Sequence, residues 1–588
     1  MKQPFAKLLR KGQDFWTLNA ERGTPNAERL TRNAERLTIN YFCSMVINGN
    51  LIDIPAKRIF PAELTITDKK IFSILELPSD ASIPDIFICP GFIDAHVHIE
   101  SSMLLPSEFA RLAVVHGTVA TVSDPHEIAN VLGISGVEYM IENGRQTPFY
   151  FYFGAPSCVP ATLFETAGAA LHAKETEQLL ARQEIKYLSE MMNFPGVLRG
   201  DEEVMKKIAL AKKYHKPVDG HAPGLRGKDL RKYILAGIST DHECFTAEEA
   251  LEKLGLGMKV LIREGSAARN FEALADLLSD HWENMMFCSD DKHPDSLVAG
   301  HINLLCARAV AKKIDLFKVL TAACINPVNH YKLEVGQLRA GDPADFILLK
   351  DLKKFEVLQT YLHGQLVAEK GITKLDSIRN QTDPNQFDCA LTKPEDFIFK
   401  ATTSEESSYP HPVIEAFDGQ LITGKYNSEI KSENGIWKTD LSKDILKIVV
   451  LNRYKKAPVA KAFIKNFGLK SGALASSVAH DSHNIVAIGT SDEALSLAVN
   501  AVINERGGIS LADNGMILKL PLPVAGLMSG DEGYRVAETY TSMDIHAKKM
   551  GSGMQAPFMT LSFMALLVIP HLKLSDLGLF DGDSFQLI

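Results

Sequence analysis

The chain has 588 residues, which is more than one hydrophobic core usually serves, so we expect several domains. Its 46% hydrophobic and 23% charged residues are typical of a globular protein, and a net charge of −9 argues against nucleic acid as a partner. The longest apolar stretch, residues 556–569, is too short to span a bilayer, and the N-terminus has no apolar segment typical of a secretory signal. We therefore expect no membrane partner.

The eight cysteines are scattered along the chain, and none forms a C-x-x-C pair. In a long chain, such cysteines fit reduced, mostly buried thiols and not a disulfide framework. This cysteine usage predicts a cytoplasmic location.

Residues 1–43 differ in character from the rest of the chain. The sequence NAER occurs at 19–22, 26–29 and 33–36, with a spacing of seven residues. This spacing could align the arginines on one face of a helix, but three short repeats are too few for a coiled coil. We expect a mobile or peripherally docked N-terminal extension.

Two separated stretches have the character of β-strands. Residues 44–89 contain short apolar runs broken by Asn-Gly, Pro and Asp-Lys turns, and residues 331–385 show the same alternation. Because the two stretches bracket residues 90–330, we expect them to pair into one small, sandwich-like β domain that a larger domain interrupts.

The segment 90–330 repeatedly runs from apolar residues into polar clusters. Helix-like stretches lie between most of these segments, for example at 201–215 and 227–237. Alternating strands and helices indicate a parallel sheet, and eight such units predict a (β/α)8 barrel with its site at the C-terminal strand ends. The predicted strand segments are 91–98, 118–127, 149–157, 185–193, 216–224, 237–244, 259–267 and 285–293.

Residues 390–588 predict a further α/β or α+β domain. Strand-like runs occur at 446–451, 484–489 and 515–526. Thr490 and Glu493 have the spacing of a capping box, which predicts the start of an apolar-rich helix.

The predicted strand ends carry residues that can bind metal ions. Two histidines two positions apart in a strand project to the same side, although a lone His-x-His favours a metal only modestly. Each residue taken singly could be a buried side chain with ordinary hydrogen bonds. Together they favour two divalent ions, Zn, Mn or Fe(II), bridged by one carboxylate. The predicted ligands are His96, His98, Glu190, His221, His242 and Asp290.

Acidic residues at the same strand ends supply general acid–base groups. A hydroxide held between two such ions is a strong nucleophile at neutral pH, and Asp290 can take its proton and return it to a leaving group. Because side chains alternate along a strand, we expect only one of Asp290 and Asp291 to point inward. We favour Asp290 as the ligand. We assign Asp291 or His293 to support the site or bind substrate. The predicted catalytic residues are Asp290, Glu190, Glu243 and Asp291.

Several long motifs carry a family resemblance that covers about residues 45–588. The segment PGFIDAHVHIESS (90–102) resembles the first-strand signature of the amidohydrolase superfamily. The segment GTVATVSDPHEIANVLG (117–133), together with SEMMNFPGV, DGHAPGL, TDHE and IREGSAARN, resembles the adenine deaminase family within it. Residues 474–489 and 520–529 are similar to the C-terminal domain of that family.

The resemblance implies hydrolysis of free adenine to hypoxanthine and ammonia at a binuclear site. It favours Mn²⁺, with Fe²⁺ or Zn²⁺ as alternatives, and a homo-oligomer, for which we expect a dimer. Addition of hydroxide to C6 requires groups that protonate or polarise the ring, although the acidic and imidazole groups near the site could equally form salt bridges at the barrel rim. The predicted substrate-binding residues are Asp124, His126, Glu127, Arg263, Glu264 and Ser266.

Two alternative functions remain at this stage. One is another amidohydrolase, acting on a cyclic amide as dihydroorotase or hydantoin hydrolases do. Such enzymes commonly bridge their metals through a carboxylated lysine on the fourth strand, whereas this strand ends in Glu190, with Lys186 close by. The other is a non-catalytic scaffold, which should lack the ligands present here.

Overall fold

The computed structural model describes residues 44–378, 382–401 and 407–588. The predicted extension with its NAER repeats lies outside these residues. Within the described ranges, no helix combines the length and apolar character needed to cross a bilayer.

A closed barrel of parallel strands forms the centre of the fold. Strand β13 pairs with β5, β5 to β9 follow in order, and β10 to β12 continue the series. The join between β9 and β10 is a bridge from Val218 to Ile238, where the Ser239 amide donates to the Val218 carbonyl over 2.9 Å. The strands are β5 (Phe92–His98), β6 (Thr118–Ser123), β7 (Tyr150–Ala155), β8 (Ile185–Met191), β9 (Val218–Gly220), β10 (Thr240–Asp241), β11 (Lys259–Arg263), β12 (Met285–Cys288) and β13 (Asp290–Asp291).

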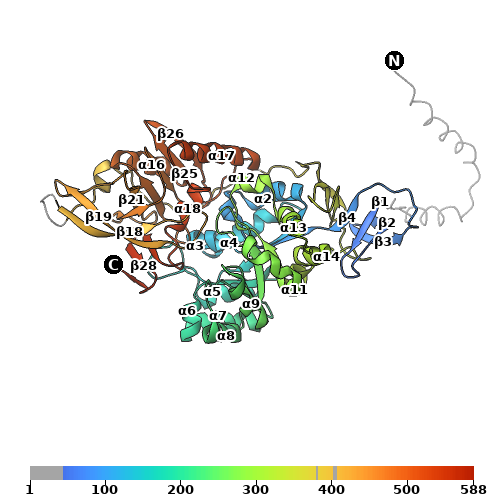
Figure 1. Ribbon diagram of the computed structural model, residues 1–588. Helices are drawn as coiled ribbons and strands as arrows, with labels where there is room; N and C mark the ends of the chain where they lie inside the picture. Colours follow the sequence, from blue (N-terminus) through green and yellow to red (C-terminus); the bar gives the residue numbers. More distant parts are fainter. Residues whose placement is uncertain (1–43, 379–381, 402–406) are drawn as a thin grey trace, which may run out of the picture. The chain divides into compact units, whose positions relative to one another are not determined.

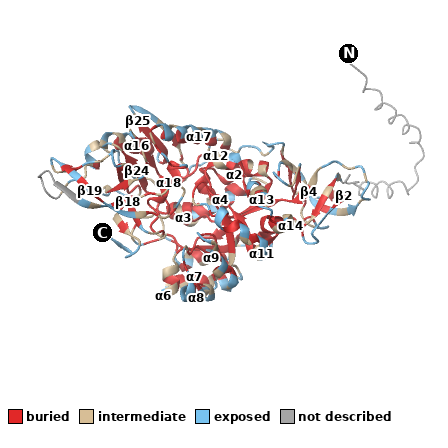
Figure 2. Ribbon diagram, in the orientation of Figure 1, coloured by how far each residue is buried: buried red, intermediate tan, exposed pale blue. Residues whose placement is uncertain are grey.

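Strands β12 and β13 are one strand interrupted at Ser289, so the barrel has eight strands that coincide with the eight predicted segments. Every residue of β5, β6 and β12 is buried, as expected for a parallel sheet covered on both faces. Figure 2 shows this burial along the strands and the exposed outer faces of the helices. The predicted (β/α)8 barrel is confirmed.

Helices connect the strands and cover the outside of the barrel (Figure 1). The helices predicted at 201–215 and 227–237 are present as α7 and α8. The helices of this region are α2 (Pro106–Ala113), α3 (His126–Leu132), α4 (Ile134–Gly144), α5 (Ala173–Leu180), α6 (Phe194–Arg199), α7 (Glu202–Lys213), α8 (Gly227–Ala236), α9 (Ala247–Gly255), α10 (Phe271–Leu274), α11 (Leu278–His281), α12 (Pro294–Ala299), α13 (Ile302–Ala311), α14 (Leu316–Leu320) and α15 (Asn326–Tyr331).

The strands that flank the barrel in sequence pair into one sheet. Antiparallel pairing of Phe346 in β14 with Pro90 in β4 joins the two stretches, so the barrel is inserted between paired strands. The sheet order is β17-β16-β15-β14-β4-β1-β2-β3. Its strands are β1 (Met45–Asp53), β2 (Arg58–Thr67), β3 (Lys70–Glu76), β4 (Phe87–Pro90), β14 (Phe346–Leu349), β15 (Val357–Leu362), β16 (Gln365–Glu369) and β17 (Ile372–Thr373). The domain boundaries given above remain predictions.

The C-terminal region is a mixed sheet with helices. Its sheet order is β20-β19-β18-β22-β21-β24-β23-β25-β26, and a smaller sheet contains β27 to β29. The strands are β18 (Ser407–Glu415), β19 (Gly424–Glu433), β20 (Ile436–Trp437), β21 (Ile445–Leu451), β22 (Ala460–Lys465), β23 (Ala473–Ser476), β24 (Ile485–Gly489), β25 (Gly508–Asp513), β26 (Met516–Pro521), β27 (Leu572–Ser575), β28 (Gly578–Asp581) and β29 (Gln586–Leu587). The helices are α16 (Asp492–Asn504), α17 (Gly533–Lys549) and α18 (Pro557–Phe563).

The cap of α16 differs from the predicted one. The Ser491 hydroxyl accepts from the Ala494 amide over 3.2 Å, so Ser491 caps the helix. Thr490 instead donates its hydroxyl to the Gly472 carbonyl over 3.1 Å, because it still belongs to the turn that leaves β24. The predicted cap at Thr490 is therefore one residue early.

Gly91 joins β4 to the first barrel strand at a point with no room for a side chain. A Cβ atom at this position would lie 2.3 Å from Cγ1 of Val119. Gly91→Ala should therefore lower the free energy of unfolding by about 1–3 kcal/mol through overpacking. Thermal unfolding of the variant checks this. Gly255→Ala is the matched control, because a Cβ there meets nothing within 4 Å, and equal melting temperatures for the two variants would contradict the account.

Candidate metal centre and active site

The six predicted ligands come together at the C-terminal strand ends. His96 and His98 lie on β5 and Glu190 lies on β8. His221 and His242 directly follow β9 and β10, and Asp290 opens β13. All six are buried, since the most exposed of them, His221, retains only 5% of its surface. This is the end of the barrel at which a (β/α)8 enzyme builds its site.

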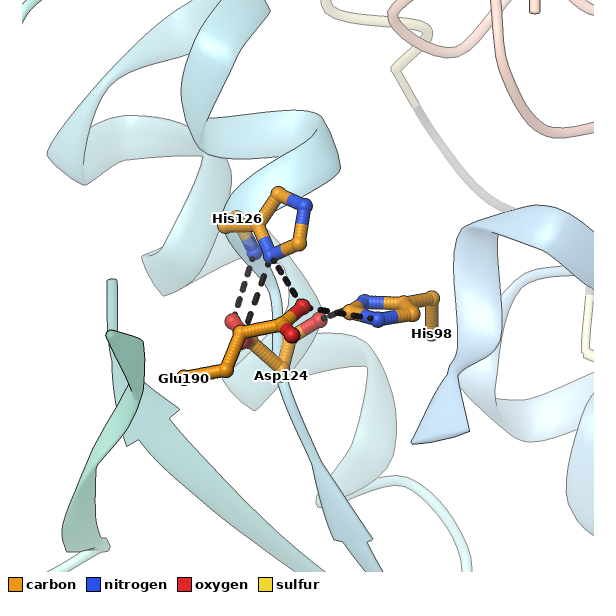
Figure 3. A group of neighbouring side chains, drawn as sticks. All are labelled: His98, Asp124, His126 and Glu190. Atoms are coloured by element: carbon orange, nitrogen blue, oxygen red, sulfur yellow. Dashed lines mark hydrogen bonds and ion pairs between the residues drawn. The ribbon is translucent and has the colours of Figure 1, made fainter. Parts of the chain in front are cut away.

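Glu190 lies between imidazoles that come from different strands. Its Oε1 is 3.3 Å from Nε2 of His98, and its Oε2 is 2.7 Å from Nδ1 of His221 and 3.2 Å from Nε2 of His242. Figure 3 shows the carboxylate pointing toward His98, with His126 and Asp124 beside it. The two oxygens of Glu190 therefore face different histidines. A carboxylate that bridges two metal ions has the same arrangement.

Asp290 is the carboxylate that faces the first histidine pair. Its Oδ1 is 3.1 Å from Nε2 of His98 and 3.5 Å from Nε2 of His96. Its backbone has a φ of 54°, in the left-handed region that non-glycine residues rarely adopt outside turns and functional sites. This kink separates β12 from β13.

The kink overturns the premise that only one of the two neighbouring aspartates can face the site. Asp291 also points into it, from a different side, because regular alternation breaks at Asp290. The Asp291 carboxylate accepts from the Ser101 hydroxyl over 2.6 Å and lies 3.2 Å from Nε2 of His480.

Several ring nitrogens in the cluster have no hydrogen-bond partner. Both nitrogens of His96 and Nε2 of His221 are buried and unpaired. A buried polar atom without a partner is costly and needs an explanation. The donor atoms also converge, because His96, His98 and Asp290 form one group within 4.8 Å and His96, Glu190 and His242 form another. Imidazoles and carboxylates so arranged fit divalent metal ions.

Arg263 balances the negative charge beside the histidines. Its guanidinium lies 2.6 Å from Oδ2 of Asp290 and 3.4 Å from Oδ2 of Asp291, and it also donates to Glu243. Burial of Asp290 favours its neutral form, but the Arg263 guanidinium and the neighbouring imidazoles outweigh this effect and hold the pKa of Asp290 well below its ordinary value. The site therefore keeps this carboxylate ionised.

Contacts around the ligands fix their orientation. Nδ1 of His98 lies 3.1 Å from the Asp124 carbonyl, which leaves Nε2 free to face Glu190 and Asp290. Asp94 of the first strand accepts from the Ser289 amide over 2.9 Å and lies 2.8 Å from Nε2 of His301. Asp94 thus ties the first strand to the eighth and does not face the metal cluster. Such supporting contacts are typical of metal ligands.

A cavity of about 270 Å³ adjoins the cluster. His242, Glu243 and Arg263 line it, and Asn270 and Gln420 are among its other lining residues. The C-terminal region therefore contributes to the cavity together with the barrel.

The predicted substrate-binding residues separate into two sets. Asp124, His126 and Glu127 are buried beside the ligands, and Arg263 lines the cavity. Glu264 instead pairs with Arg308 over 2.6 Å. The Ser266 hydroxyl donates to the hydroxyl of Ser296 over 2.9 Å. Substrate binding by either set remains a prediction.

Three buried residues of the C-terminal region were not predicted as site residues. His480 lies 3.0 Å from Oε1 of Glu127, His483 pairs with the same carboxylate, and Asp481 lies 3.5 Å from Nε2 of His126. The available signal was the polar run HDSHN at 480–484, enclosed by apolar strands. Because this run is far from the barrel strands in sequence, its position beside the barrel end could not be predicted.

Removal of one predicted ligand should empty part of the metal centre. After reconstitution with Mn²⁺, His221→Ala and His242→Ala should each retain less metal while staying folded, because the remaining predicted ligands form an incomplete set. Changes to residues that only support a ligand already lower metal affinity by about 10–100-fold. Elemental analysis after desalting measures the metal. His172→Ala is the control, since that side chain is 74% exposed. Full metal content in either ligand variant would refute its assignment.

Comparisons with known proteins agree with this geometry. The amidohydrolase family matches residues 87–367, and the adenine deaminase C-terminal domain matches residues 420–586. An adenine deaminase from Sulfurovum sp. (strain NBC37-1) is 55% identical over 545 residues, which cover 92% of this chain and 99% of that protein. One from Salinibacter ruber is 53% identical over 547 residues, covering 93% of this chain and 98% of that protein.

A third relative shows a similar level of identity. The adenine deaminase of Methanosarcina barkeri is 51% identical over 544 residues, which cover 92% of this chain and 98% of that protein. Identity at this level over almost the full length of each relative requires the same barrel and the same C-terminal region. The chain belongs to the adenine deaminase family, with an amidohydrolase barrel as its central domain.

Proposed function

We propose that the chain hydrolyses free adenine to hypoxanthine and ammonia. The observation that carries this proposal is the buried set of four histidines and two carboxylates at the barrel end, in a chain 55% identical to a protein named adenine deaminase. In the reaction, a C–O bond forms at C6 of the purine, the bond from C6 to the amino nitrogen breaks, and the amine leaves as ammonia after gaining a proton.

We assign the metal ligands to two groups. His96, His98 and Asp290 would hold one divalent ion, His221 and His242 would hold the other, and Glu190 would serve both. The unpaired ring nitrogens of His96 and His221 support this assignment. Divalent ions at such a site lower the pKa of water toward about 7 and so supply hydroxide at neutral pH. We favour Mn²⁺, with Fe²⁺ or Zn²⁺ as alternatives, because the ligands mix nitrogen and oxygen donors.

The remaining steps belong to side chains of this chain. Asp290, which is buried and faces both His96 and His98, accepts the proton of the nucleophile and delivers it to the leaving amine. Glu243 lines the cavity beside His242, and we assign it to exchange a proton with a ring nitrogen as C6 becomes tetrahedral. Arg263 contacts the carboxylates of Asp290 and Glu243, holds them in place and keeps them charged.

The alternatives find less support. A lysine-bridged cyclic amide hydrolase would need Lys186 at the metals, but its ammonium group pairs with Glu334 over 2.7 Å, near the start of β8. A scaffold without catalysis would not keep a complete, buried ligand set. We retain two expectations as proposals: that the chain forms a homo-dimer and that it works in the cytoplasm.

The substrate should be the free base. The cavity beside the cluster measures about 270 Å³ and suits a purine ring. We expect ammonia release from adenine and none above background from adenosine or cytosine, because a ribose on the ring must find room in the same cavity. A coupled ammonia assay over this panel checks the expectation, and adenosine turnover comparable to that of adenine would contradict it.

Asp290→Asn should keep the fold but lose most of the rate. Asparagine preserves the shape of the side chain but cannot accept a proton, and general acid–base groups contribute about 10²–10⁴-fold. The measurement is kcat with adenine at equal metal content. A rate within a few-fold of the parent enzyme would transfer the role to Asp291, whose carboxylate lies next to it on β13.

A further inference from the structure

A second convergence of buried donor atoms lies beside the binuclear cluster. His126 and Glu127 open helix α3 after the second barrel strand, and Asp481 comes from the C-terminal region. Nε2 of His126 lies 3.5 Å from Oε1 of Glu127 and 3.5 Å from Oδ1 of Asp481. The three donor atoms all lie within 4.8 Å of one another, and all three residues are buried.

Hydrogen bonds do not account for this arrangement. Nε2 of His126 and Oδ2 of Asp481 are buried without a hydrogen-bond partner. A single N–H shared between two carboxylate oxygens, each 3.5 Å away, would give only weak, three-centre contacts. Ligand atoms around a tetrahedral ion with bonds of about 2.1 Å are separated by roughly 3.4 Å, which is close to both separations from the His126 nitrogen.

The surroundings orient these groups as the partners of metal ligands do. Nδ1 of His126 lies 3.2 Å from Oδ2 of Asp124, which leaves the Nε2 lone pair facing Glu127 and Asp481. A histidine that binds a metal through one ring nitrogen usually presents the other to a carboxylate or carbonyl. Two imidazoles, those of His480 and His483, contact the Glu127 carboxylate from the side of the C-terminal region.

We propose that His126, Glu127 and Asp481 bind a further divalent metal ion, separate from the two held by the six strand-end ligands. The ion offsets the charge of two buried carboxylates and links the start of helix α3 to the segment around Asp481. The two parts are far apart in sequence, since His483 and Glu127 differ by 356 positions. The role is structural: the ion fastens the C-terminal region over the barrel end.

The competing explanation is a network without a metal, in which protons on His480 and His483 balance the carboxylates. His480 already lies within 3.2 Å of Asp291 and 3.0 Å of Glu127, so its proton serves two acceptors. In that network Nε2 of His126 forms no hydrogen bond with either carboxylate, although it lies 3.5 Å from both, and a bound ion accounts for that spacing. The two explanations differ in the metal content of the protein.

The test is the amount of Mn²⁺ retained by the full-length protein after reconstitution and desalting. We expect about three ions per chain in the parent protein and about two in Asp481→Asn, which keeps the shape of the side chain but not its charge. Asp531→Asn, an exposed aspartate in the same region, is the matched control and should keep about three. About two ions in the parent protein, or an unchanged content in Asp481→Asn, would overturn the proposal.

A second measurement does not depend on the folding of a variant. Crystals of the Mn²⁺-loaded parent protein should give an anomalous peak bounded by His126, Glu127 and Asp481, apart from the peaks at the six strand-end ligands. Peaks confined to those six ligands would overturn the proposal.

Discussion

The placement of the Glu190 carboxylate is the constraint on which the site depends. Its oxygens lie 2.7 Å from His221 and 3.3 Å from His98, which come from different strands. A buried carboxylate is stable only when charge or hydrogen bonds compensate it, so these strands must end at matching heights around it. A closed parallel barrel meets this requirement, because all of its strands end on the same side.

Closure of the barrel then fixes the position of Asp290, another of the proposed ligands. Strand β13 pairs with β5 so that Asp290 lies opposite Val97, between the two histidines of the first strand. Arg263, opposite Cys288 on the neighbouring strand, reaches the carboxylates of both Asp290 and Glu243. The positions of the proposed ligands, of the Arg263 charge beside them and of the cavity wall thus follow from strand register.

Local patterns in the sequence were sufficient for much of this account. Buried parallel strands are apolar runs that end in polar residues, so all eight strand segments and the imidazole and carboxylate groups that meet at their ends could be predicted. The left-handed backbone at Asp290 could not be predicted, because it breaks the regular alternation of side chains along a strand. The sequence also did not predict that the C-terminal region brings His480, Asp481 and His483 to the barrel. Contacts between residues hundreds of positions apart leave no local pattern. The choice of Ser491 over Thr490 as a cap depended on where β24 ends.

The central claim is that metal ions held at the strand ends are required for deamination. The most direct test is the turnover of adenine by protein stripped of metal with a chelator, before and after Mn²⁺ is returned, with circular dichroism to confirm that the fold persists. The account predicts that turnover is lost on stripping and recovers as Mn²⁺ is restored. Turnover by folded, metal-free protein at the rate of the loaded enzyme would contradict it.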